Sequence, residues 1–180
     1  MELRYLGGWA LLLSAAFSLL SVTWDSLISG SPAAAPIRAI VLLGSVLFVV
    51  GLPAIWALQP QIGRVGLAGL VLMAIGAVVA LAISLYFILG GTGIDEALPF
   101  AGALISLLGA LIVGWQTVRA GVVATWIGWL LICGGVLNFA GGLTDARSLA
   151  APVSFLGGAA GAVAIGAFGW NIVVHRRATT

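Results

Sequence analysis

This sequence predicts an all-α membrane protein that folds as a bundle of six transmembrane helices. The bundle is one integral membrane domain covering residues 1–180. Six apolar runs are each about 20 residues or longer, the length that a helix needs to cross the hydrocarbon core of a bilayer. The runs cover residues 6–28, 37–58, 65–89, 98–118, 122–143 and 152–174, and nearly every charge lies in the short segments between them. Hydrophobic residues make up 62% of the chain and charged residues only 7%, against about 25% charged residues in soluble domains. Because a backbone inside lipid must satisfy its own hydrogen bonds, each run is expected to be a helix.

The first run, 6–28, is predicted to be a retained spanning helix rather than a cleaved signal peptide. It is longer than the apolar core of a signal peptide, and no Ala-x-Ala cleavage pattern with a soluble sequence follows it. The next apolar run begins at residue 37, so the two runs are expected to form a helical hairpin.

Proline opens the second, fourth and sixth runs, at Pro36, Pro99 and Pro152. Proline is favoured in the first turn of a helix because its missing N–H has no helical partner there. Pro53 lies inside the second run and predicts a kink. The third and fifth runs, like the first, lead into the predicted outer loops.

Arginine placement predicts a multi-pass membrane protein with both termini in the cytoplasm. All 7 basic residues are arginine, and with the N-terminus inside only Arg38 and Arg147 fall on the outer side. The inner side then receives Arg4, Arg64, Arg119, Arg176 and Arg177. An excess of arginine in cytoplasmic loops is the usual pattern of such proteins. Of the 7 tryptophans, all but Trp24 fall near inner helix ends, which predicts an interfacial belt or, alternatively, an aromatic-lined pocket.

Glycines recur every seven residues in several runs. The series are Gly44 and Gly51, Gly69 and Gly76, Gly102 and Gly109, and Gly121, Gly128, Gly135 and Gly142, and the sixth run adds Gly157 and Gly161. A seven-residue repeat keeps small residues on one seam and lets two helix backbones approach closely. The seams predict close packing, either within the bundle or between the subunits of a homo-oligomer.

Polar residues inside the apolar runs are the first candidates for function because they are costly in a membrane. Ser14, Ser18, Ser21 and Asp25 follow one another at steps of four, three and four, which places them on one helix face. One interpretation is a groove open to the outer side, in which Asp25 binds a cation or an amine. The other is that the serines bond back to their own helix and that Asp25 is a snorkelling or salt-bridged helix-end residue.

Two further polar residues are predicted at the same outer depth. Arg38 begins the second helix, and Asn138 lies in the fifth. With Asp25 they form a candidate cluster, in which an Asp25–Arg38 pair would clamp the first two helices together. Asn138 is expected either to bond across a helix interface or to contact a ligand.

The sequence offers no catalytic, cofactor-binding or metal-ligating residues, and we expect a protein that is not an enzyme. His175, the only histidine, lies in the terminal tail, and there is no lysine, no HExxH motif and no phosphate-binding glycine loop with lysine. Cys133, the only cysteine, is expected to be a buried, inert thiol. The net charge of +2 reflects few charges rather than a basic surface, so nucleic acid is not an expected partner.

Two stretches carry a resemblance. The first is GLPAIWA at 51–57, continuing through Gln61 and GRVGLAG at 63–69, and the second is TVRAGVV at 117–123, followed by WIGWLL at 126–131. Together they resemble a set of bacterial multi-spanning membrane proteins with motifs close to GLPxLYxxQ and TLRAGVLPRWxGWLL. Here Trp56 stands where those proteins often have tyrosine, and Ala124 and Thr125 where they often have Pro-Arg. The resemblance implies a six-helix or similar bundle in the bacterial cytoplasmic membrane and carries no established activity.

Two functional hypotheses remain open at this point. The first is a non-catalytic membrane protein that acts through the lipid bilayer or through protein partners. The second is a small transporter or ligand-binding sensor that uses an outer-half groove formed by Ser14, Ser18, Ser21, Asp25 and Asn138. The small number of polar groups inside the runs favours the first hypothesis.

Overall fold

The computed structural model describes residues 2–27, 34–143 and 150–177. Six long helices and one short 3-10 helix follow one another: α1 (Glu2–Leu27), α2 (Ala34–Leu58), η1 (Pro60–Ile62), α3 (Gly63–Ile88), α4 (Ala97–Ala120), α5 (Thr125–Leu143) and α6 (Ala150–Arg177). Each long helix contains a stretch of at least 19 residues that is apolar enough to cross a membrane, with a mean hydropathy of 1.5 to 2.6. The predicted all-α bundle of six spanning helices is therefore confirmed.

The helix ends differ from the predicted runs at identifiable places. α1 begins at Glu2, several residues before the apolar run, and α3 begins at Gly63, which directly follows η1. α4 continues to Ala120 and ends where Gly121 adopts a left-handed conformation, with φ 60°, and donates its N–H to the carbonyl of Thr117. Gly121 is thus the cap of α4 and not the first member of a glycine seam in α5, as the seven-residue spacing predicted.

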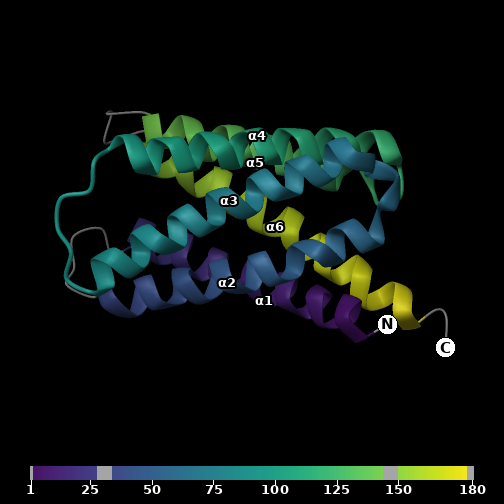
Figure 1. Ribbon diagram of the computed structural model, residues 1–180, viewed down its shortest axis with the longest axis horizontal. Helices are drawn as coiled ribbons and strands as arrows, with labels where there is room; N and C mark the ends of the chain where they lie inside the picture. Colours follow the sequence, from purple (N-terminus) through teal and green to yellow (C-terminus); the bar gives the residue numbers. More distant parts are fainter. Residues whose placement is uncertain (1, 28–33, 144–149, 178–180) are drawn as a thin grey trace.

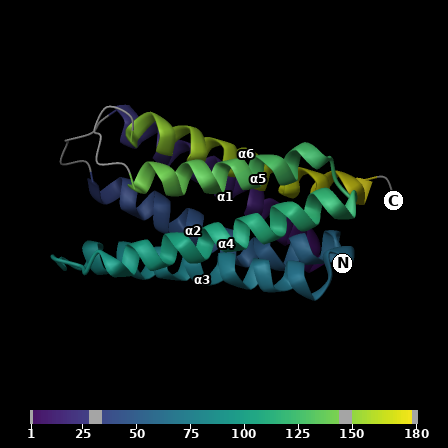
Figure 2. The same cartoon turned by 90° about the horizontal axis from the view of Figure 1, so that it is seen from above.

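The six helices form a closed ring in chain order. Within the described residues each helix packs against the next one, and α6 returns to pack against α1, while the only other contact between long helices joins α2 and α6. Figure 1 shows α1 and α2 on one side of the bundle and α4 and α5 on the other. In the view turned by 90°, α5 and α6 lie on one side and α3 and α4 on the other (Figure 2). The start of α1 and the end of α6 lie at the same end of the bundle (Figure 1). We call this the terminal end, and the opposite one the distal end.

Glycines form the seams of this ring, as the seven-residue spacing predicted. Gly51 faces Leu11 across the α1–α2 contact, and a Cβ on Gly109 would lie 2.7 Å from the carbonyl oxygen of Gly69 across the α3–α4 contact. Gly128 packs in the same way on the backbone of α4. Both partners of each seam belong to one chain, so these glycines serve packing within the bundle.

The hydrophobic core is confined to the terminal half of the bundle. Its buried residues lie in the first half of α1, α3 and α5 and in the second half of α2, α4 and α6, which are the parts of the six helices nearest the terminal end. Phe168, Leu11, Ile55, Ile127 and Val113 are among its fully buried members. The distal half has no comparable cluster among the described residues, and the three cavities described below lie there and at mid-bundle.

Candidate ligand cavities in the distal half

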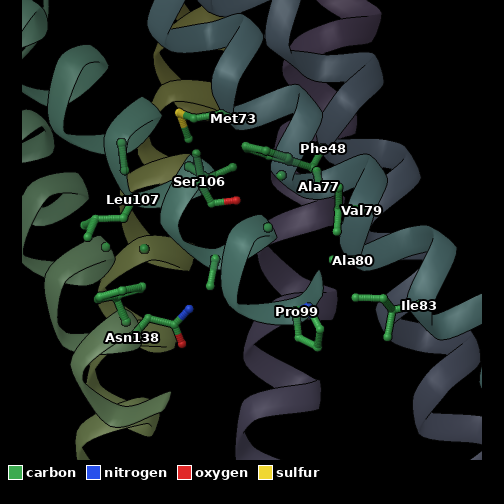
Figure 3. Close-up of a pocket in the computed structure, with 18 of the residues that line it drawn as sticks. Phe48, Met73, Ala77, Val79, Ala80, Ile83, Pro99, Ser106, Leu107 and Asn138 are labelled. Carbon is green, nitrogen blue, oxygen red and sulfur yellow. The ribbon is translucent and has the colours of Figure 1, made fainter. Parts of the chain in front are cut away.

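A central cavity of about 520 Å³ is lined by residues of α2 to α6 and is partly open. Its walls are mostly apolar and reach from Met73 in α3, at the edge of the core, to Pro99 in the first turn of α4. Three polar side chains line it: Ser84, Ser106 and Asn138. Figure 3 shows Phe48, Ser106 and Asn138 around this space, each on a different helix. The volume falls in the range of about 300 to 1,000 Å³ that is usual for small-molecule pockets.

A second cavity, of about 320 Å³, lies between α1, α2, α5 and α6, and we call it the serine cavity. Ser14, Ser18, Ser21 and Ser45 line it together with Asn138. It shares four lining residues with the central cavity: Phe48, Asn138, Gly161 and Ile165. The two cavities therefore meet at these residues. The structure brings the predicted serine face of α1 together with Asn138 of α5.

A third cavity, of about 780 Å³, lies between the distal ends of α4 and α5, and we call it the end cavity. It is lined by Glu96, Phe100, Asn138 and Phe139 among others. The rings of Phe100 and Phe139 lie with their centroids 5.7 Å apart and inclined by 47°, so they form an aromatic pair beside Asn138. Asn138 is the residue that all three cavities share.

Most of the serine hydroxyls in these cavities are already satisfied by backbone. Ser14 is buried and donates to the carbonyl of Gly44 at 2.9 Å, which joins α1 to α2. Ser21 donates to Ser18 and Ser45 to Val41, each within its own helix. The interpretation that the serines bond back to their own helix thus describes Ser21, while Ser14 bonds to the backbone of a neighbouring helix instead.

Three polar side chains of the cavity walls remain available to a ligand. The side chains of Asn138, Ser18 and Ser106 form no hydrogen bond with another described residue, although each lines at least one cavity. Asn138 is exposed, and its amide carries both donors and an acceptor. Asn138 is therefore the side chain best placed to orient a bound molecule.

The rest of the predicted cluster lies outside the described residues. The side chains of Asp25 and Arg38 belong to the undescribed part of the chain, so the predicted clamp between α1 and α2 stays a prediction. Among the described side chains no charged group lines the central or the serine cavity, and no group of three potential metal ligands occurs.

Two features differ from, or go beyond, the sequence-based expectations. Cys133 is exposed on the outer surface of α5 rather than buried, because it lies on the opposite face of that helix from Gly128 and Leu131. Ser106 was not singled out, since one serine in an apolar run carries no pattern. The sequence feature that could have identified Ser106 is the glycine spacing. Ser106 faces Gly76 of α3, and only a glycine leaves room for its hydroxyl there.

No protein-family model, curated protein or solved structure matches this chain.

Proposed function

We propose that this protein is a non-catalytic membrane protein that binds a neutral, lipid-like amphiphile in the cavities that meet at Asn138. One observation supports the proposal above the others: three cavities share the exposed amide of Asn138, which has no hydrogen-bond partner among the described residues. A concave apolar site with a few convergent polar groups is the usual form of a small-molecule pocket.

The chemistry of the walls selects the ligand class. The walls are mainly aliphatic and aromatic, so they favour an apolar body such as an acyl chain. The free amide and hydroxyls of Asn138, Ser18 and Ser106 favour one uncharged polar group that both donates and accepts hydrogen bonds. A charged headgroup would lose its hydration against the walls of the central and serine cavities without gaining an opposite charge among their described side chains, and Glu96 of the end cavity would repel an anionic one.

The bilayer itself is the proposed source of the ligand. The six helices that line the cavities are apolar enough to lie in a bilayer, so lipid would surround the bundle. The end cavity lies between the distal ends of α4 and α5. An amphiphile that enters there passes the Phe100–Phe139 pair and reaches Asn138 before the central cavity. We therefore propose diacylglycerol, which has a free hydroxyl and two acyl chains, as the first probe, with anionic phosphatidylglycerol as the charged comparison.

The test replaces the amide while keeping the shape of the site. Asn138→Leu removes every hydrogen-bonding atom of that side chain, and Asn171→Leu is the matched control, because Asn171 donates to the carbonyl of Ala167 in its own helix and lines none of the three cavities. At about 100 times its dissociation constant, a ligand stabilises the folded protein by about 2.7 kcal/mol. We expect diacylglycerol to raise the melting temperature of the wild type and of Asn171→Leu in detergent, but not that of Asn138→Leu. Equal shifts in all three proteins would contradict the proposal.

A second variant fills the cavity instead of changing its polarity. A Cβ on Gly161 would meet no atom within 4 Å, and Gly161 lines both the central and the serine cavity. Gly161→Leu should therefore fold normally and abolish the thermal shift, since its side chain occupies the space of the ligand. The control is Val163→Leu, which enlarges an exposed side chain of the same helix. A full ligand response in Gly161→Leu would place the ligand elsewhere.

A small transporter is the second candidate, and the uneven packing of the bundle favours it. The cavities occupy the distal half and mid-bundle, whereas the terminal half is closed by the hydrophobic core. This is the form of a carrier that is open to one side. Saturable solute uptake into proteoliposomes, lost in Asp25→Asn while that variant remains folded, would favour transport over lipid binding.

The setting of the protein is part of the proposal. We place it in the bacterial cytoplasmic membrane with both termini cytoplasmic, as the arginine distribution predicts. Arg4, Arg64 and Arg119 are exposed at the terminal end. Trp115, Trp126 and Trp170 are about half exposed near that end, at 54%, 50% and 60%, as the rings of an interfacial belt would be. Kinship with the bacterial proteins that share the GLPxLYxxQ-like motif, and homo-oligomerisation through glycines, stay proposals.

A further inference from the structure

Two polar side chains are completely buried in the hydrophobic terminal half. Gln59 and Thr117 are each 0% exposed, and Gln59 Nε2, Gln59 Oε1 and Thr117 Oγ1 have no hydrogen-bond partner among the described residues. Burying such atoms without a partner is among the more costly arrangements in a folded chain. Three of them at the same end of one small bundle require an explanation.

The two residues lie at neighbouring elements of the fold. Gln59 follows the last residue of α2 and caps η1, and η1 contacts α4. Ile62 of η1 and Val113 of α4 are members of one buried cluster. Thr117 lies four residues after Val113 and therefore on the same face of α4.

Thr117 does not make the local hydrogen bond that several other helical hydroxyls make. Thr23, Ser45 and Ser84 each donate to the carbonyl four residues earlier in their own helix, at 2.7 to 2.9 Å. The same bond from Thr117 would go to the carbonyl of Val113, and the hydroxyl does not make it. A hydroxyl that forgoes this local bond is free for a partner outside its own helix.

The mixture of donors and acceptors indicates the kind of partner. Gln59 contributes an N–H₂ donor and a carbonyl acceptor, and Thr117 contributes a hydroxyl that does both. A cation would occupy the two oxygens and leave the N–H₂ group unpaired, and an anion would leave the carbonyl unpaired. A small neutral molecule that donates and accepts satisfies all three atoms, and water is the smallest such molecule.

We propose that Gln59 and Thr117 form a buried hydration site in the terminal half, in which bound water supplies the hydrogen bonds that no described residue supplies. The backbone of the same turn is already in use: the N–H of Gln59 donates to the carbonyls of Ile55 and Trp56, and its carbonyl accepts from Ile62. The side-chain atoms are therefore the groups that hold the water. The site does not depend on the proposed amphiphile, which lies beyond Met73 in the distal half.

The decisive measurement is an experimental structure of the full chain at a resolution that shows ordered water. We expect density for water within about 2.7 to 3.2 Å of Thr117 Oγ1 or of the Gln59 amide. A structure in which Thr117 donates to Val113 and Gln59 bonds to protein atoms, with no water at either residue, would overturn the proposal. Because this experiment uses the wild type, it does not depend on whether a variant folds.

Near-isosteric variants supply the second measurement. Thr117→Val and Gln59→Leu remove the polar atoms at little change in volume, and Thr23→Val is the control for the same change on an exposed helix face. If water is bound, both variants lose its hydrogen bonds, and the melting temperature should fall by about 3 °C or more, with Thr23→Val changing less. If the site is dry, the variants remove unpaired polar atoms, and an unchanged or raised melting temperature would refute the hydration site.

Discussion

Replacing Gly109 by alanine should test the packing of α3 against α4 directly. A Cβ at this position would lie 2.7 Å from the carbonyl oxygen of Gly69 and 2.7 Å from both the backbone nitrogen and the Cγ of Met73. Two of these three atoms belong to the backbone of α3, so rotation of a side chain cannot relieve the contact. The two helices must move apart.

The size of that movement sets the expected loss of stability. To restore an ordinary contact of about 3.4 Å, the two helices must move apart by roughly 0.7 Å. A gap of this size costs about a quarter to a half of the dispersion energy of the atom pairs along the seam. Overpacked substitutions of this kind typically cost about 1 to 3 kcal/mol. Alanine also favours the helix over glycine by up to about 1 kcal/mol, which partly offsets the loss.

Gly161→Ala is the matched control because it gains the same helix propensity without the contact. A Cβ on Gly161 meets no atom within 4 Å. The difference between the two variants therefore isolates the steric cost, and we expect Gly109→Ala to melt about 2 to 12 °C below Gly161→Ala. Thermal unfolding in detergent, followed by the fluorescence of the 7 tryptophans, gives both values. Equal melting temperatures would refute the inferred seam between α3 and α4.

Two further substitutions test a hydrogen bond between two helices and the conformation of a helix cap. Ser14→Ala should lower the free energy of unfolding by about 1 kcal/mol, because it removes the buried hydrogen bond from α1 to the carbonyl of Gly44 in α2. Ser45→Ala is the control and should cost less, because it loses only a hydrogen bond within α2. Equal effects in chemical denaturation would show that the α1–α2 bond adds nothing. Gly121→Ala should cost about 1 kcal/mol through strain alone, since its φ is 60° and no atom lies within 4 Å of the added Cβ. A tolerated Gly121→Ala with an unchanged melting temperature would mean that α4 does not end in a left-handed cap.

The candidate site was predictable in part. The serine face of α1 followed from steps of three and four along one helix, and the structure places Ser14, Ser18 and Ser21 beside Asn138 in one cavity. The contribution of α3 and α4 was not predictable, because Ser106 is an isolated serine whose neighbour across the seam depends on the pairing of two helices. The burial of Gln59 was also unforeseen, since it lies at a helix end next to residues predicted to face water.

The amino-acid sequence by itself determined the number of spanning helices, their approximate ends and the spacing of their glycine seams. These properties are local: the length of an apolar run, the backbone's need for internal hydrogen bonds and the helical repeat act within one segment. Tertiary structure alone decided which seams pair, that Cys133 points outward, and that the core fills only the terminal half. In a membrane, lipid-facing and protein-facing sides of a helix are equally apolar, so hydrophobicity does not distinguish them, and close packing between particular backbones makes the choice.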